Sequence, residues 1–160
     1  MTFSQGATTL VGSYTNTASG LTSANYSIAY VPAKLSILAW TLAGFYQPVD
    51  MSAGGMVYNT VKGGSTVQMK FNIYQSTQAN TNERTDVGAV KSFTATPYVC
   101  TASATDEIEI VTTGGTVLRY DTTGQQFIQN WATPKAAGTC YQVTMTALDG
   151  SKLTAYFKLK

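Results

Sequence analysis

Acidic side chains cluster at one place in the chain, the stretch TDEIEI, which contains Asp106, Glu107 and Glu109. Glu107 and Glu109 would share one face of a strand, and carboxylate oxygens are the hard ligands that Ca²⁺ prefers. The alternative is a solvated strand face with Ile108 and Ile110 directed inward. Because no Asp-rich loop of fixed spacing supports a metal site, we predict no metal centre, with a weak calcium site near Asp106 and Glu109 as the alternative.

The other residue types argue against catalysis. The chain has no histidine, the side chain that most often serves as general base, metal ligand or pH switch. A Ser or Cys nucleophile therefore lacks a histidine partner. The 8 acidic residues are scattered and form no recognisable catalytic pair. We predict that the protein is not an enzyme and uses no cofactor.

Cys100 and Cys140 are the only two cysteines. Two thiolates cannot form a four-ligand zinc site by themselves. In a chain that is rich in Thr and only 11% charged, a disulfide is favoured over two free buried thiols. Such a bond would stabilise the fold by ~4 kcal/mol in the chain-entropy treatment. It also indicates an oxidising, extracellular compartment.

Several aromatic side chains could form a platform on which sugars stack, which makes carbohydrate binding the alternative function. Aromatic residues in a β-sandwich are more often core residues, and Trp131 alternates with Phe127 as a core residue would. The platform candidates are Trp40, Trp131, Tyr46, Tyr58, Tyr98, Tyr120 and Tyr156.

Charge and hydropathy exclude two kinds of partner. The net charge of +2 is spread thinly, without a Lys/Arg cluster, so we expect no nucleic-acid partner. No apolar run approaches the roughly 20 residues that span a membrane. The opening MTFSQGATTLVGSYTN lacks the basic start and apolar block of a signal peptide. We therefore expect a mature or excised part of a secreted protein, or an added Met1.

Alternation of period two recurs along the chain, and no helical period is sustained. It is clearest in 65–74, 141–147 and 152–160, and Asp149-Gly150 between the last two is a strong hairpin signal. We expect a polar surface loop at Gln75–Gly88. Short strands separated by turns indicate an antiparallel sandwich. Further strands are predicted at Tyr26–Val31, Leu35–Leu42, Lys91–Thr96, Glu107–Thr112, Thr116–Tyr120 and Gln126–Trp131.

Four stretches carry a family resemblance: GFYQPVD, NTVKGGSTVQMKF, TGGTVLRYDTTGQQFIQNWATPKAAGTCYQVTMTALDGS and AYFKLK. Through them, residues from about Gly44 to Lys160 resemble the PxKF domain, a module at the C-terminal ends of large bacterial secreted and surface proteins. The motif that names the family reads Pro-x-Lys-Phe, whereas this chain has Gln68-Met69-Lys70-Phe71. A proline there would remove a backbone donor and blunt a sheet edge, and Gln68 restores the N–H.

The stretch GLTSANYSIAYVPAKLSI, Gly20–Ile37, is similar to the last strands of MBG domains. These bacterial Ig-like repeats are strung in tandem in adhesins and surface-layer-like proteins. Only about half of such a repeat is present, so the resemblances imply a partial MBG-like β-segment at 1–43 and a PxKF-like domain at 44–160. Neither resemblance implies an enzyme.

We therefore predict an all-β fold, an Ig-like antiparallel β-sandwich with one disulfide, preceded by a partial Ig-like β-segment. The predicted function is that of a structural extracellular module of a bacterial cell-surface or secreted protein. Half a repeat cannot close its own sandwich, so its apolar faces and strand edges would stay exposed. We expect them to pair by β-strand addition with other copies of the chain or with neighbouring modules. Such pairing would give filaments or a surface layer. The candidate assembly-edge residues are Tyr26, Ile28, Leu35, Ile37 and Gln68.

Overall fold

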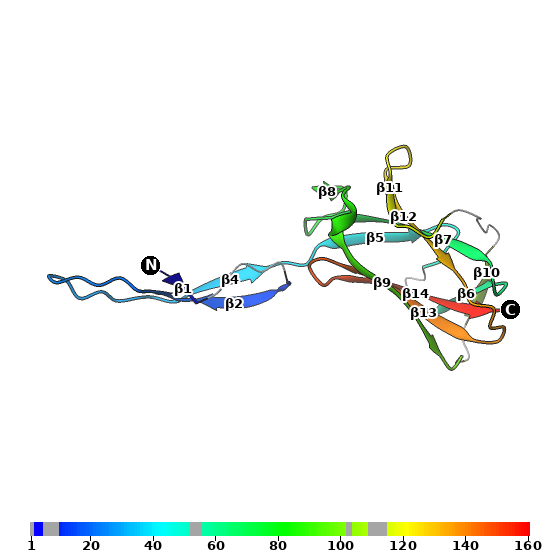
Figure 1. Cartoon of the computed structure of the whole chain (residues 1–160), viewed down its shortest axis with the longest axis horizontal. Helices are drawn as coiled ribbons and strands as arrows, with labels where there is room; N and C mark the ends of the chain where they lie inside the picture. Colours follow the sequence, from blue (N-terminus) through cyan, green and yellow to red (C-terminus); the bar gives the residue numbers. More distant parts are fainter. Residues whose placement is uncertain (1, 5–9, 52–55, 102–103, 109–114) are drawn as a thin grey trace.

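The computed structural model describes the whole chain except residues 1, 5–9, 52–55, 102–103 and 109–114. An elongated N-terminal arm, described at residues 2–4 and 10–37, leads into a two-sheet sandwich that carries the C-terminus (Figure 1). In chain order the described elements are β1 (Thr2–Phe3), β2 (Gly12–Asn16), β3 (Ala18–Ser19), β4 (Ala33–Ile37), β5 (Thr41–Tyr46), β6 (Val57–Val61), β7 (Thr66–Tyr74), β8 (Glu83–Arg84), the 3-10 helix η1 (Val87–Ala89), β9 (Val90–Tyr98), β10 (Ala104–Glu107), β11 (Arg119–Asp121), β12 (Gln126–Ala132), β13 (Cys140–Ala147) and β14 (Lys152–Leu159).

The sandwich consists of two sheets. The first has the strand order β10-β6-β14-β13-β9, and the second has the order β11-β12-β7-β5, with β8 added beside β7. Pairing is antiparallel except that β6 runs parallel to both of its neighbours, β10 and β14. The predicted fold class, an all-β Ig-like antiparallel β-sandwich with one disulfide, is confirmed, and β6 is its parallel exception.

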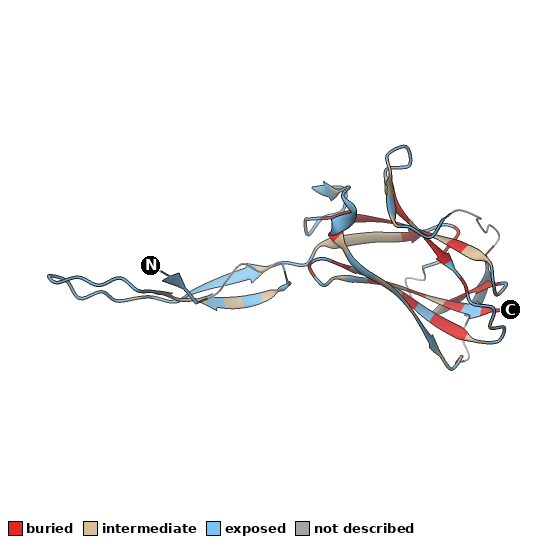
Figure 2. Cartoon of the chain, viewed as in Figure 1, coloured by how far each residue is buried: buried red, intermediate tan, exposed pale blue. Residues whose placement is uncertain are grey.

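The core lies between the two sheets, where Figure 2 shows the buried residues. It is built from the alternation that the sequence predicts, because every second side chain of β7, β13 and β14 points inward. Trp131 of β12 packs on Tyr141 and Phe157 of the opposite sheet, with ring centroids 5.7 and 4.9 Å apart. Phe71 stacks on Phe127 at 5.4 Å. The prediction that Trp131 is a core residue is confirmed.

The predicted hairpin at Asp149-Gly150 joins β13 and β14, two neighbouring interior strands of the first sheet. β13 and β14 pair in continuous register from Cys140↔Lys158 to Thr146↔Lys152. Gly150 has a φ of +95°, a left-handed conformation that glycine adopts without steric cost. The turn closes with the Ala147 N–H donating to the Ser151 carbonyl at 2.9 Å.

Two strand predictions in the N-terminal quarter are corrected. Tyr26–Val31 forms no strand, because the ladder between β2 and β4 ends at Asn16↔Ala33 and no described segment pairs with the residues beyond it. The predicted strand Leu35–Leu42 is two strands, β4 and β5. In the segment between these two strands, the Trp40 N–H donates to the side chain of Asp149 instead of to a neighbouring strand.

Two strands of the sandwich were not predicted: the two-residue β8, which lies within the predicted loop Gln75–Gly88, and β6. Its sequence VYNTV lacks alternation because the polar residues Asn59 and Thr60 are buried with the apolar ones. The Asn59 amide is satisfied: it accepts from the Asp50 N–H at 2.8 Å and donates to the carbonyls of Asp50 and Tyr156, each at 3.1 Å. A polar side chain can be buried when its hydrogen-bond partners are present, and it then interrupts the apolar pattern from which a strand is predicted.

The predicted strands Glu107–Thr112 and Thr116–Tyr120 are shifted. β10 ends at Glu107, and the part of the prediction at 109–112 lies outside the described residues. β11 occupies only Arg119–Asp121. The predictions at Lys91–Thr96 and Gln126–Trp131 are confirmed as β9 and β12.

The disulfide joins Cys100, which follows β9, to Cys140, the first residue of β13, with the two Cα atoms 5.2 Å apart. The predicted pairing is confirmed. By alternation Cys140 lies on the sheet face opposite to the core. The next residue after Cys100, Thr101, donates its N–H to the Tyr58 hydroxyl at 3.1 Å. The disulfide and this hydrogen bond together hold the segment after β9 over that outer face.

We predict that reducing the Cys100–Cys140 bond lowers the free energy of unfolding by about 4 kcal/mol, because the unfolded chain regains the entropy of an open loop. Urea denaturation with and without reductant measures the difference. A Cys100→Ser/Cys140→Ser double variant should behave like the reduced protein in both conditions. Equal stability of the oxidised and reduced chains would contradict the prediction.

Candidate functional site

The arm carries four of the predicted assembly-edge residues. Leu35 and Ile37 lie on β4, and Tyr26 and Ile28 lie in the segment beyond the β2–β4 ladder. The fifth, Gln68, lies on β7 opposite Asn130 of β12, and the pairing of β7 with β5 ends at Tyr46↔Lys70, short of Gln68. One side of Gln68 is therefore paired with β12, and its role in assembly stays a prediction.

The arm is long and thin. β2 pairs with β4, and β1 pairs with β3 through Thr2↔Ser19 and Phe3↔Ala18. Beyond β3 and β4, two extended segments run side by side to the end of the arm far from the sandwich (Figure 1). They are linked where the Tyr30 hydroxyl contacts the Leu21 N–H at 2.6 Å and the Leu21 carbonyl at 3.1 Å.

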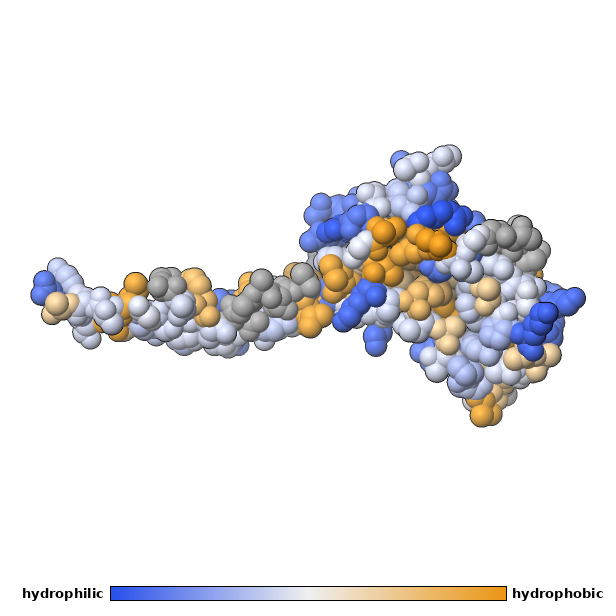
Figure 3. Space-filling model, in the orientation of Figure 1, coloured by the Kyte–Doolittle hydropathy of each residue, from blue (hydrophilic) through white to orange (hydrophobic). Residues whose placement is uncertain are grey.

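None of the described residues between 2 and 37 is buried (Figure 2). The arm nevertheless carries large apolar side chains, and Figure 3 shows apolar surface along its length. Tyr26 is 80% exposed and Val31 is 84% exposed. A two-stranded ribbon without a second layer is marginally stable in water, since it buries little apolar surface. Phe3, Leu10, Val11, Leu21, Ile28 and Leu35 are also exposed.

The joint between arm and sandwich consists of Leu38–Trp40, Leu10, Val11 and the hairpin turn at Asp149–Ser151. Its centre is the carboxylate of Asp149, a residue only 1% exposed. Asp149 accepts from the Trp40 N–H at 2.7 Å, from the Ser151 N–H at 3.0 Å and from the Ser151 hydroxyl at 2.6 Å. A buried carboxylate needs such donors, because it has lost its contacts with water.

A second contact ties the start of β2 to the same turn. The Val11 N–H donates to the Asp149 carbonyl at 3.2 Å. The Leu10 side chain lies over the turn and would be 3.9 Å from a Cβ atom at Gly150. Asp149 thus holds both chain segments that enter the arm. Sequence reasoning used Asp149-Gly150 only as a turn signal and did not find this role, which depends on contact with Trp40 far away in the chain.

The acidic cluster is described only in part. Glu109 lies outside the described residues, and Glu107 forms a surface ion pair with Lys160 at 2.9 Å. Within the described part of the chain, no three acidic or cysteine side chains gather as metal ligands would. The calcium alternative therefore stays a prediction.

The candidate platform aromatics do not form one surface. Trp131 is in the core, whereas Tyr58, Tyr98 and Tyr156 pack together on the outer face of the first sheet, with Tyr98 6.3 and 6.2 Å from its two neighbours. Burial raises the pKa of Tyr98, and the hydrogen bond to Thr101 lowers the pKa of Tyr58. This cluster supports the segment that the disulfide holds.

Tyr120 belongs to a second polar cluster, on the other sheet. Its hydroxyl donates to the Glu83 carboxylate at 3.0 Å, and the Asn72 amide donates to the same oxygen at 2.6 Å. Burial, followed by the hydrogen bond to Glu83, raises the pKa of Tyr120 to about 12. Since Glu83 lies on β8, this cluster fixes part of the predicted loop Gln75–Gly88 to the sheet.

Among the comparisons with known proteins, the match that was found falls on the arm. The MBG domain family of the YGX type matches residues 1–36. The predicted MBG-type character of the N-terminal segment is thus supported. No curated protein and no solved structure matches the chain. The resemblance of the sandwich to the PxKF domain is not matched by any of these comparisons and stays a prediction. No helix in the described part of the chain combines the length and apolarity needed to span a membrane.

We predict that Asp149→Ala lowers the free energy of unfolding by about 3 kcal/mol, because the three donors around the buried carboxylate lose their acceptor. Leu38–Trp40 should also become sensitive to limited proteolysis. Asp86→Ala, which removes a surface ion pair with Arg84, is the control and should leave stability nearly unchanged. Equal effects of the two variants would show that Asp149 does not hold the joint.

We predict that stability falls as the pH rises from about 10, the usual pKa of tyrosine in an unfolded chain, toward the raised pKa of Tyr120 near 12. In this range the unfolded chain loses the proton while the folded chain keeps it. Urea denaturation at several alkaline pH values should show a smaller fall for Tyr120→Phe than for the unmodified protein. Tyr26→Phe, at an exposed position, should match the unmodified protein, and identical curves for all three proteins would refute the prediction.

Proposed function

We propose that this chain is a non-catalytic structural module of a bacterial surface or secreted protein, joined to other copies of itself by β-strand addition through the arm. The MBG match at residues 1–36 and the disulfide support a bacterial extracellular setting. The absence of histidine from the sequence supports a non-catalytic role.

The observation that carries the proposal is the exposure of the arm. β4 pairs only with β2 among the described strands, so its other backbone edge can pair with an added strand. On the same arm Val31 and Tyr26 present their side chains to solvent. An added strand satisfies the edge through main-chain hydrogen bonds and covers alternate side chains. It thereby widens the two-stranded ribbon to three strands, whose apolar face can then pack against another copy.

A second copy fits this role because it carries the same arm. Two arms offer each other the second edge of β4 and exposed apolar side chains. Little charge opposes their approach, since Lys34 is the only charged residue described between 2 and 37. A contact between different faces of successive copies does not close on itself and gives filaments, whereas a contact between identical faces gives dimers.

We expect the intact chain to form dimers or larger assemblies as its concentration rises, and Val31→Asp to weaken this association at least about tenfold, because a carboxylate would be buried without a partner. Light scattering during size-exclusion chromatography measures the mass, and electron microscopy shows whether filaments form.

The matched control is Val117→Asp. Val117 is 78% exposed, close to the 84% of Val31, but it lies on the sandwich. This variant should assemble like the intact chain. A monomeric intact chain at millimolar concentration, or equal association of the two variants, would overturn the proposal.

A further inference from the structure

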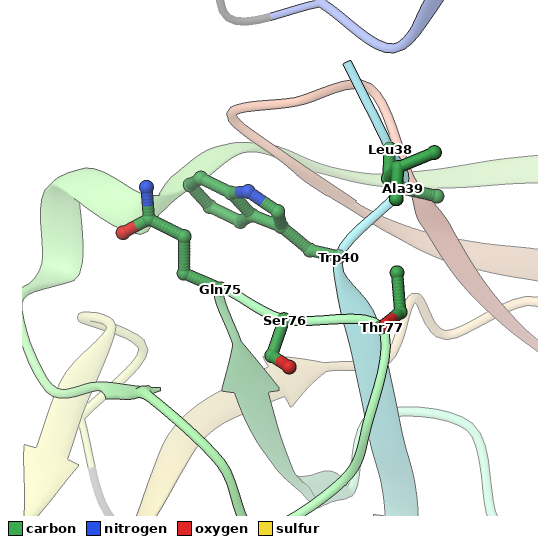
Figure 4. Close-up of a pocket in the computed structure, with 6 residues that line it drawn as sticks. All are labelled: Leu38, Ala39, Trp40, Gln75, Ser76 and Thr77. Atoms are coloured by element: carbon green, nitrogen blue, oxygen red, sulfur yellow. The ribbon is translucent and has the colours of Figure 1, made fainter. Parts of the chain in front are cut away.

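A shallow pocket of about 260 Å³ lies beside the joint, between the segment that precedes β5 and the segment that follows β7 (Figure 4). Its volume is close to the lower limit of small-molecule sites, so it accommodates one ring of a ligand rather than a long chain. The pocket is lined by Leu38, Ala39, Trp40, Gln75, Ser76 and Thr77.

Hydrogen bonds hold the two walls of the pocket in place. The Thr41 N–H and the Thr41 hydroxyl both donate to the Ser76 carbonyl at 2.9 Å. One residue earlier, the Trp40 N–H donates to Asp149. The backbone on either side of Trp40 is therefore fixed before any ligand arrives, which lowers the entropic cost of binding.

The indole of Trp40 is half-buried, unlike that of Trp131, which is enclosed in the core. The Arg84 guanidinium lies 5.7 Å from the centre of the Trp40 ring. Arg84 is not among the described residues that line the pocket, and Trp40 also packs against the hydrophobic core. This cation holds the ring in position without occupying the pocket.

The charge of Arg84 is neutralised. Its Nε and Nη2 donate to Asp86 at 2.9 and 2.6 Å, and its Nη1 donates to the Gln75 side-chain oxygen at 2.8 Å. The described lining residues are all uncharged. A ligand that depends on charge would find no unpaired partner here, and the site favours a neutral molecule.

The lining combines an aromatic ring and two small apolar surfaces with an amide and two hydroxyl groups. Figure 4 shows the indole of Trp40 and the side chain of Gln75 on the same side of the pocket. A sugar ring in its pyranose form has a face of C–H groups that stacks on an indole, and a rim of hydroxyls that exchange hydrogen bonds with amides and hydroxyls. We propose that this pocket is a binding site for one neutral pyranose unit of a glycan. The proposal does not depend on assembly through the arm.

Saturation-transfer difference NMR tests the proposal, because it detects weak binding to monomers and to large assemblies alike. The probes are methyl β-D-glucopyranoside, methyl β-D-galactopyranoside and the methyl β-glycoside of N-acetylglucosamine. We expect saturable binding of at least one probe with a millimolar Kd, as suits a small open site. Transfer should be strongest at the C–H protons of one sugar face.

Trp40→Ala and Gln75→Ala should each weaken binding at least about tenfold. Tyr26→Ala removes an aromatic ring that is 80% exposed on the arm, and it should leave binding unchanged. If Trp40→Ala disturbs the joint, as circular dichroism would show, Gln75→Ala decides the test. Absence of saturable binding by every probe, or binding that survives Gln75→Ala undiminished, would overturn the proposal.

Discussion

The position of the arm depends on the buried carboxylate of Asp149. It lies in the turn between β13 and β14, two neighbouring strands inside the first sheet. Through its hydrogen bond with the Trp40 N–H, the core hairpin holds the segment between β4 and β5. The same residue receives the Val11 N–H on its carbonyl. The direction in which the arm leaves the sandwich is thus coupled to the most regular part of the core, and the pocket at Trp40 depends on the same hydrogen bond.

The two parts of the chain differ in what stabilises them. The sandwich buries complete side-chain layers from both sheets, and the disulfide holds the segment after β9 over its outer face. The arm has backbone pairing without a buried layer, so the hydrophobic effect contributes little to its stability. Its apolar side chains, such as Val31, gain their full contribution only when another surface covers them. This difference gives the exposed arm its proposed role in joining modules.

Sequence reasoning succeeded where one local rule was sufficient. Alternation predicted the inward faces of β7, β13 and β14, and Asp149-Gly150 predicted the hairpin. It failed where non-local contacts decided the outcome. β6 was missed because its buried Asn59 interrupts the apolar pattern. The predicted strand Leu35–Leu42 is two strands, and the Trp40 N–H between them bonds to Asp149. The pocket at Trp40 depends on two segments that lie far apart in the sequence.

Hydrogen–deuterium exchange at two protein concentrations tests the central claim most directly, since added strands protect the backbone amides with which they pair. The account predicts that amides of β4 (Ala33–Ile37) and of Tyr26–Val31 exchange rapidly in dilute solution and slowly at concentrations where the chain assembles. Amides of β13, inside the sandwich, should be protected equally in both conditions. Rapid exchange of the arm in the assembled state would contradict the claim that assembly adds strands to the arm.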